Sequence, residues 1–260
     1  MTEATSTKWH ELWKHMPADQ YYPWKFALPP NNGEDAYWIL VAKHLSPDAD
    51  VLEAGCGYGR DAVAIAPRCR SLVAYDRLPE CIDWTRRQVQ QQHIDNATFV
   101  CTDSRADANN GRVTIPAKPD QFDLLVSRRG PTNWLEDARR VARKGARLIQ
   151  LNPVAQPVPP WNDELPEALR FPILEPDTIR QRIERRLAVS GLQIDSCWTF
   201  DVPAFFESIE EFYRSRTFGW DQAPPLAELR SDLERIFATH AGPQGLGVRF
   251  CRFLWQGLVE

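Results

Sequence analysis

The stretch Val51-Leu52-Glu53-Ala54-Gly55-Cys56-Gly57-Tyr58-Gly59-Arg60-Asp61 decides the fold. A short apolar run, interrupted by one acid, leads into a glycine-rich turn, and a helical pattern follows the turn. Glycine adopts the left-handed backbone conformations that a tight turn needs, and a strand that enters a helix through such a turn brings its backbone close to a ligand. The stretch therefore predicts the first strand–turn–helix unit of a ligand-binding α/β sheet.

Two phosphate-binding interpretations of this turn fit poorly. The dinucleotide fingerprint expects a glycine at the sixth position of the turn, where this chain has Arg60, and the P-loop interpretation fails because no Gly-Lys-Ser/Thr follows. Glu53, just before the turn, would repel a pyrophosphate, whereas it would attract a ligand that carries an ammonium and a sulfonium group. The turn therefore favours a positively charged ligand.

The rest of the chain continues the alternation of strand and helix. Strands are expected at residues 51–54, 71–76, 97–103, 122–127, 147–152, 192–201 and 248–257, and helices at residues 61–66, 79–93, 132–144 and 176–190. Short strands that are apolar on both faces suit a parallel sheet, and right-handed crossovers between them give a doubly wound one. The last two strands are long and aromatic-rich. We therefore predict a Rossmann-like α/β fold, with a seven-stranded, mostly parallel sheet and an antiparallel edge pair.

Three segments fall outside this alternation. Residues 1–50 hold two helical patterns around an aromatic turn and are expected to form an N-terminal helical lid. Residues 153–176 hold seven prolines, too many for a helix or a central strand, and predict a long ordered loop. Residues 202–243 carry two amphipathic helical patterns and predict a helical insertion before the last strand. Residues 51–260 are thus expected to be a single domain that contains this insertion.

The stretch at residues 51–61 resembles the first motif, (E/D)xGxGxG, of the class I S-adenosylmethionine-dependent methyltransferases. Residues 51–152 follow the order of strand ends that is typical of this family. The resemblance implies S-adenosyl-L-methionine as the cofactor and methyl transfer as the activity. The cofactor contacts that it implies in and before the turn are Glu53, Gly55, Cys56 and Gly57.

The resemblance implies further cofactor contacts at the ends of the next strands. Asp76 would accept hydrogen bonds from both ribose hydroxyls, which requires an ionised carboxylate, and Arg77 would lie along the adenine. Asp103 and Ser104 match the family's contacts to the adenine amino group and ring, and Ser127 ends the strand that faces the sulfonium methyl. Asp76 and Asp103 also have a plain structural interpretation as helix N-caps.

Residues that would act on the methyl acceptor are marked less clearly. His15 is a candidate general base, which is needed only when the nucleophile carries a proton of high pKa. Arg128 and Arg129 follow the fourth strand, where acceptor-contacting residues of the family usually lie. They would either clamp an anionic acceptor or pair with a nearby carboxylate. The sequence leaves the methylated atom and the oligomeric state open.

Charge and missing motifs narrow the class of acceptor. The 260-residue chain has a net charge of −4, and residues 1–50 and 201–242 each hold more acids than bases, which disfavours a nucleic-acid channel there. Enzymes that methylate exocyclic amines of bases usually carry Asn/Asp-Pro-Pro-aromatic after the fourth strand, where this chain has Ser127-Arg128-Arg129-Gly130-Pro131. A small-molecule acceptor is the leading hypothesis. An RNA substrate that uses the arginine-rich residues 128–147, and a non-catalytic protein that binds the cofactor or a nucleotide, are the alternatives.

Metal, membrane and export signals are missing from the sequence. The six cysteines have no CxxC spacing and no paired histidine, so neither a zinc site nor a disulfide framework is expected. The longest apolar stretches fall far short of the roughly 20 residues of a membrane helix. The N-terminal residues lack the apolar core of a secretion signal. We therefore expect a cytoplasmic protein with no metal and no membrane partner.

Overall fold

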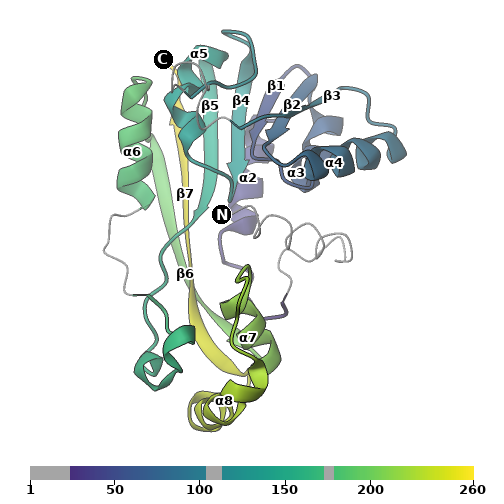
Figure 1. Cartoon of the computed structure of the whole chain (residues 1–260). Coiled ribbons are helices and arrows are strands. Elements are labelled where there is room, and N and C mark those ends of the chain that lie inside the picture. The colour runs from purple at the N-terminus through teal and green to yellow at the C-terminus, as the bar shows by residue number, and fades with distance from the viewer. Residues whose placement is uncertain (1–23, 104–112, 173–178) are drawn as a thin grey trace. The chain divides into compact units, whose positions relative to one another are not determined.

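The computed structural model describes residues 24–103, 113–172 and 179–260. The chain divides into two compact units, which we call the sheet unit and the helical unit. The sheet unit comprises residues 33–154, 177–200 and 252–260, and the helical unit comprises residues 1–32, 155–176 and 201–251. The elements of both are labelled in Figure 1.

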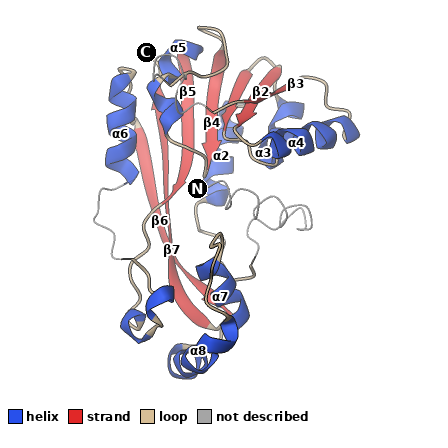
Figure 2. Cartoon of the chain, in the orientation of Figure 1, coloured by secondary structure: helices blue, strands red, loops and turns tan. Residues whose placement is uncertain are grey.

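A seven-stranded sheet with the order β3-β2-β1-β4-β5-β7-β6 is the centre of the fold (Figure 2). Its strands are β1 (Asp50–Ala54), β2 (Ser71–Asp76), β3 (Ala97–Cys101), β4 (Phe122–Arg128), β5 (Ala142–Pro153), β6 (Ser196–Phe206) and β7 (Leu246–Leu258). The pairs among β1 to β5 are parallel, β7 runs antiparallel to β5, and β6 is the edge strand beside β7. The predicted mostly parallel sheet with an antiparallel edge pair is confirmed.

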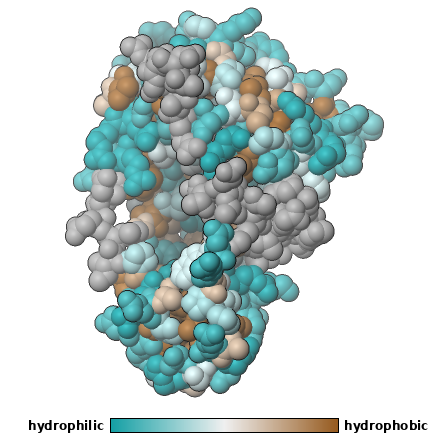
Figure 3. Space-filling model, viewed as in Figure 1, coloured by the Kyte–Doolittle hydropathy of each residue, from teal (hydrophilic) through white to brown (hydrophobic). Residues whose placement is uncertain are grey.

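Helices cover both faces of the sheet unit. The first face carries α2 (Glu34–His44), α3 (Arg60–Ile65) and α4 (Pro79–Gln91), and the second carries η2 (Asn133–Glu136), α5 (Ala138–Val141) and α6 (Ile179–Val189). The alternation along β1 explains this arrangement, because Val51 belongs to the core of the first face and Leu52 to that of the second. The outer side of α4 is hydrophilic (Figure 3), since Asp83, Arg86 and Arg87 are exposed there.

The helical unit has an aromatic core of its own. It contains η3 (Asn162–Glu164), η4 (Glu167–Leu169), α7 (Ile209–Thr217) and α8 (Leu226–His240). Trp161 and Phe171 come from the proline-rich segment and pack against Phe212 of α7, with the Trp161 and Phe212 ring centroids 5.9 Å apart. The segment expected to be a loop thus supplies part of a core. A backbone bridge between Ala27 and Phe205 ties residues before the sheet unit into the helical unit.

One helix expected from the sequence differs from the structure. The helix expected over residues 132–144 is only η2 and α5, because β5 already begins at Ala142, which pairs with Phe122 of β4. Strand pairing therefore overrides the helical pattern of this stretch. The division into a lid of residues 1–50 and a domain of residues 51–260 stays a prediction. In the structure α2 belongs to the sheet unit, where Tyr37 and Val41 are fully buried. Residues 1–23 lie outside the described part of the chain.

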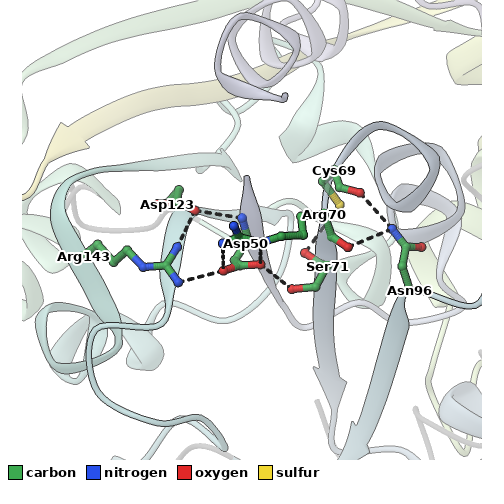
Figure 4. A network of polar contacts seen from close by, with 7 residues as sticks. All are labelled: Asp50, Cys69, Arg70, Ser71, Asn96, Asp123 and Arg143. Atoms are coloured by element: carbon green, nitrogen blue, oxygen red, sulfur yellow. Dashed lines mark hydrogen bonds and ion pairs between the residues drawn. The ribbon is translucent and has the colours of Figure 1, made fainter. Parts of the chain in front are cut away.

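Charged residues hold the amino ends of the parallel strands together (Figure 4). Asp50 accepts hydrogen bonds from Arg70 Nε at 2.9 Å, from Ser71 Oγ at 2.7 Å and from Arg143 Nη2 at 2.7 Å. Arg143 also donates to Asp123 Oδ2 at 2.5 Å. The arginine hydrogen bonds hold the pKa of Asp50 well below its usual range. This network, which we call the amino-end cluster, joins β1, β2, β4 and β5.

Candidate functional site

The order of strands places the candidate site at the carboxyl ends of β1 and β4. The chain runs outward from β1 through β2 to β3 and then returns to β4 on the other side of β1. Open α/β sheets bind their ligands at such a reversal, in the crevice beyond the carboxyl ends of the strands. Glu53 lies near the end of β1, and Ser127 and Arg128 end β4.

The turn after β1 contains three glycines, two of which allow close packing while the third borders open space. Gly55, Gly57 and Gly59 all have positive φ, at 72°, 51° and 68°. A Cβ on Gly55 would come within 2.5 Å of Pro131 Cδ, and one on Gly59 within 2.1 Å of Thr85 Cγ2. A Cβ on Gly57 would meet no heavy atom of the described residues within 4 Å. Gly55 and Gly59 thus allow close packing, whereas Gly57 borders open space where a ligand can approach.

Four N–H groups of the turn are engaged within the protein. Those of Gly55 and Cys56 donate to the carbonyl oxygen of Tyr75 at 2.9 and 3.0 Å. Gly59 donates to the Cys56 carbonyl, and Gly57 donates to Asp76 Oδ2 at 2.9 Å. A phosphate-binding turn needs such donors aimed at the ligand. This geometry agrees with the sequence argument against a phosphate-binding turn.

Asp76 lies at the end of β2, directly beside the turn. Besides the bond from Gly57, its Oδ1 accepts the N–H of Leu78 at 3.1 Å. A carboxylate has about four lone-pair sites, so both oxygens keep the capacity to accept a ligand's hydroxyl groups. Burial raises the pKa of Asp76, and the backbone N–H groups oppose that shift. Asp76 is therefore a partly buried carboxylate whose two oxygens are held in a fixed orientation.

The other residues predicted to contact the adenine lie near Asp76 or outside the described chain. Thr102 donates its N–H to the carbonyl oxygen of Asp76 at 2.9 Å, which brings the end of β3 to the end of β2. Asp103 follows it and is exposed, while Arg77 is partly buried. Ser104 lies outside the described residues.

Glu53 is a buried acid on the face of β1 that carries α2 and α3. Its relative exposure is 3%, and its Oε2 accepts no hydrogen bond from any described residue. Burial raises the pKa of Glu53, and the nearby carboxylate of Asp61 raises it further. A buried carboxylate without a partner is costly, so the group needs either a proton or a cationic ligand.

Arg128 is paired with acids and is not available as a clamp for an anionic acceptor. Its Nε donates to Asp61 Oδ2 at 2.9 Å, its Nη2 donates to Asp61 Oδ1, and its Nη1 donates to Glu34 Oε2 at 2.8 Å. The side chain is 4% exposed, and its guanidinium lies over the rings of Tyr37 and Trp38. Of the two interpretations from sequence, the structure supports the ion pair. We call Arg128, Asp61 and Glu34 the arginine triad.

The remaining predicted site residues serve local structure or lie outside the description. Ser127 is fully buried, and its hydroxyl donates to the Ala54 carbonyl at 2.7 Å, so it joins β4 to β1. Arg129 has a positive φ of 63°, and its Nε lies 3.9 Å from Glu34 Oε1. His15 lies outside the described residues.

Sequence analysis missed Glu34, Asp61 and Tyr37. Asp61 stands at the end of the deciding stretch, and an acid just after a glycine-rich turn was a usable signal. Glu34 lies 94 residues from Arg128, and nothing local in the sequence links the two. Tyr37 is fully buried, and its hydroxyl has no hydrogen-bond partner among the described residues. Within the described chain, no group of three or more His, Cys, Asp or Glu residues could hold a metal ion, and no helix is long and apolar enough to span a membrane.

Comparison with known proteins agrees with this geometry. A family model described as a methyltransferase domain matches residues 51–151. Residues 51–151 are thus similar to a methyltransferase domain. The matched residues of the methyltransferase domain run from β1 to β5 and include Glu53, the glycine turn, Asp76 and Arg128.

Individual relatives match about half of the chain or share the fold. Nodulation protein S of Rhizobium tropici is 32% identical over 124 residues, or 47% of this chain and 46% of that protein. The uncharacterized methyltransferase YcgJ of Bacillus subtilis is 22% identical over 45% of this chain and 43% of its own. This chain therefore spans less than half the length of either relative. A solved structure of a functionally unknown protein from Deinococcus radiodurans R1 shares the fold, with a TM-score of 0.66, 22% identity and 92% coverage of both chains.

Proposed function

We propose that this protein is an S-adenosyl-L-methionine-dependent methyltransferase that acts on a small-molecule acceptor. The observation that carries the proposal is the joint placement of three features at the carboxyl ends of neighbouring strands. These are the unpartnered Oε2 of Glu53, the open face of Gly57 and the fixed carboxylate of Asp76.

The residues fit the chemistry of the cofactor. Asp76 presents two oriented carboxylate oxygens, which suit the paired hydroxyls of a ribose. Glu53 offers a buried oxygen, Oε2, that accepts no hydrogen bond from the described residues, which suits the ammonium of the cofactor's amino-acid part. Gly57 leaves room for close approach between the two. A dinucleotide fits less well, because Glu53 would face its pyrophosphate and the N–H groups of the turn are engaged elsewhere.

The protein's contribution to the reaction is positioning. When bound, S-adenosylmethionine supplies a methyl group that is already activated on a sulfonium. Asp76 and Glu53 would fix the two ends of that molecule and so orient it relative to the end of β4. Among the described residues, Ser127 and Arg128 are engaged with the Ala54 carbonyl and with carboxylates, so neither supports a general-base step.

The engagement of the arginine-rich segment favours a small acceptor over RNA. Arg143 is bonded to Asp50 and Asp123 in the amino-end cluster. Arg140 donates to Asp137 and to backbone carbonyl oxygens, while Arg139 reaches the carbonyl of Glu260. A channel for single-stranded nucleic acid needs cations that are available to phosphates. These arginines are largely committed to holding the fold.

Titration calorimetry followed by a transfer assay tests the proposal. S-adenosylmethionine and S-adenosylhomocysteine should bind to the purified protein, and NAD should not. Labelled methyl groups should then enter a small-metabolite extract at about 0.15 M salt, while cellular RNA stays unlabelled. RNA binding that falls steeply with salt, with a slope of about −0.7 per phosphate contact, would contradict the small-molecule acceptor. Tight NAD binding without binding of S-adenosylhomocysteine would contradict the cofactor.

A further inference from the structure

We propose that Arg128, Asp61 and Glu34 act together as positioning residues that keep Glu53 unpaired for the ammonium of the cofactor. The inference rests on the proposed function and deepens it, because none of the three residues of the arginine triad need touch the ligand. It explains why Glu53 forms no ion pair with Arg128, although the buried Arg128 guanidinium is close by.

Arg128 is the cation that would otherwise pair with Glu53. Glu53 pairs with Val126 of β4, and Arg128 lies two residues further along β4, so its side chain is on the same face of the sheet as Glu53. The charge of Arg128 also opposes the upward shift of the Glu53 pKa. All three of its guanidinium nitrogens nevertheless donate to the other two members of the triad: Nε and Nη2 to Asp61, and Nη1 to Glu34. The paired geometry with Asp61 is the bidentate arrangement that orients a guanidinium most strongly.

The surroundings of Glu53 explain why this division of partners matters. Asp61 of α3, Asp76 at the end of β2 and Tyr37 of α2 all interact electrostatically with Glu53. Among the described residues, the cation Arg128 does so as well. Two of these neighbours are acids, and the hydroxyl of Tyr37 has no hydrogen-bond partner among the described residues. If Arg128 lost its hydrogen bonds to Asp61 or Glu34, its guanidinium could donate to the Oε2 of Glu53. Arg128 and Glu53 would then form an ion pair. A ligand ammonium would then have to compete with an internal cation.

The test compares two ligands that differ in their amino-acid end. S-adenosylhomocysteine carries the ammonium, whereas 5′-methylthioadenosine has the nucleoside and the sulfur but no amino acid. Calorimetry on the full chain should show that Asp61→Asn weakens S-adenosylhomocysteine about ten-fold and leaves 5′-methylthioadenosine within about two-fold. A ten-fold change corresponds to about 1.4 kcal/mol.

A double-mutant cycle separates positioning from general disruption. Glu53→Gln should weaken S-adenosylhomocysteine to a similar degree, and adding Asp61→Asn to it should have little further effect, because Glu53 is then no longer there to capture Arg128. Asp137→Asn is the matched control: Asp137 makes a similar bidentate pair with Arg140 in the sheet unit, and its neighbour Ala138 packs in the core of the second face. That variant should bind both ligands as the wild type does.

The outcomes distinguish the inference from the proposed function. If the wild type binds neither ligand, the proposed function fails. If it binds both but Asp61→Asn weakens both equally, or neither, the positioning role of the triad is wrong. Additive losses in the double variant would likewise overturn it. Glu34→Gln, which changes the other partner of Arg128, covers the case in which Asp61→Asn does not fold, and it should show the same preference between ligands.

Discussion

Asp50 and Glu53 lie on the same five-residue strand, β1, and their carboxyl groups have opposite electrostatic surroundings. Asp50 accepts from two arginines and a serine at the amino end of the strand. Glu53, near the carboxyl end, is buried and has no described donor to its Oε2. The charged form is therefore stabilised at the first position and penalised at the second. β1 therefore carries a stabilising, ion-paired carboxylate at its amino end and, near its carboxyl end, a carboxyl group that can bind a cation.

Asp50→Asn should destabilise the protein at neutral pH and have a smaller effect in acid. The arginine hydrogen bonds lower the pKa of Asp50 in the folded state. Its contribution to stability is therefore present above the unfolded pKa of about 3.9 and is lost as the pH falls towards the lowered folded value. Urea unfolding of both proteins at pH 7 and at pH 3 measures this. A difference in unfolding free energy that is equal at the two pH values would contradict it.

Glu53→Gln should show the opposite pH dependence in the ligand-free protein. Burial raises the pKa of Glu53 in the folded state. The contribution of Glu53 to stability is therefore fully present below the unfolded pKa of about 4.3 and is lost as the pH rises through the raised folded value. The melting temperature of the variant relative to the wild type should increase between pH 5 and pH 8. A constant difference across that range would show that Glu53 has an ordinary pKa.

Asp76→Asn should weaken S-adenosylhomocysteine about ten- to a hundred-fold, since charge-assisted hydrogen bonds contribute roughly 1.5–3 kcal/mol. Asparagine keeps an oxygen that can accept from Gly57 or Leu78. Asp76→Ala would leave both N–H groups unpaired, so it should also lower the melting temperature. Calorimetry and thermal unfolding of the two variants separate these effects. Unchanged affinity in folded Asp76→Asn would remove Asp76 from the cofactor site.

Alanine at two glycines of the turn should give different defects. Gly59→Ala drives its Cβ into Thr85 and strains a positive φ, so we expect a clear loss of thermal stability. Gly57→Ala strains φ as well, but its Cβ meets open space. Its main effect should be a lower affinity for the cofactor. Measuring the melting temperature and the S-adenosylhomocysteine affinity of each variant tests this. If Gly57→Ala and Gly59→Ala lost equal stability and equal affinity, the different roles of the two glycines would be contradicted.

Removing residues 1–23 tests the predicted lid. The glycine turn, Asp76 and Asp103 all lie downstream, and the cut retains Trp24, which packs against Phe218 with ring centroids 5.7 Å apart. Cofactor affinity should change little, and the methyl-transfer rate should fall much more, because an uncovered site admits water. Loss of folding on truncation would show that these residues are core and not a lid.

Local patterns made the strands and the turn predictable. β1 and β2 are short apolar runs with abrupt ends, and the glycine spacing marks the strand–turn–helix unit. The helix expected over residues 132–144 was wrong because pairing of Ala142 with Phe122, a non-local interaction, decides the structure there. The core residues of the proline-rich segment, such as Trp161, could not be predicted. Its prolines exclude a helix or a central strand but do not indicate which side chains are buried.

The candidate site was predictable where it depends on strand ends and not where it depends on distant pairs. Asp76 could be identified because an acid at the end of a strand is a local feature. The role of Arg128 could not, because its position after β4 is compatible with contacts to a ligand or to a carboxylate. Only the fold brings Glu34 and Asp61 to it.

The long sequence separations within the arginine triad impose an order of assembly. Glu34 and Asp61 lie 94 and 67 residues before Arg128, so their charges can be compensated only after β4 has joined the sheet. Closing such long loops costs entropy before any contact is gained. During synthesis the two acids emerge from the ribosome well before their cation. A nascent chain that ends before Arg128 would contain the whole glycine turn and Asp76, yet it should be unable to hold the cofactor.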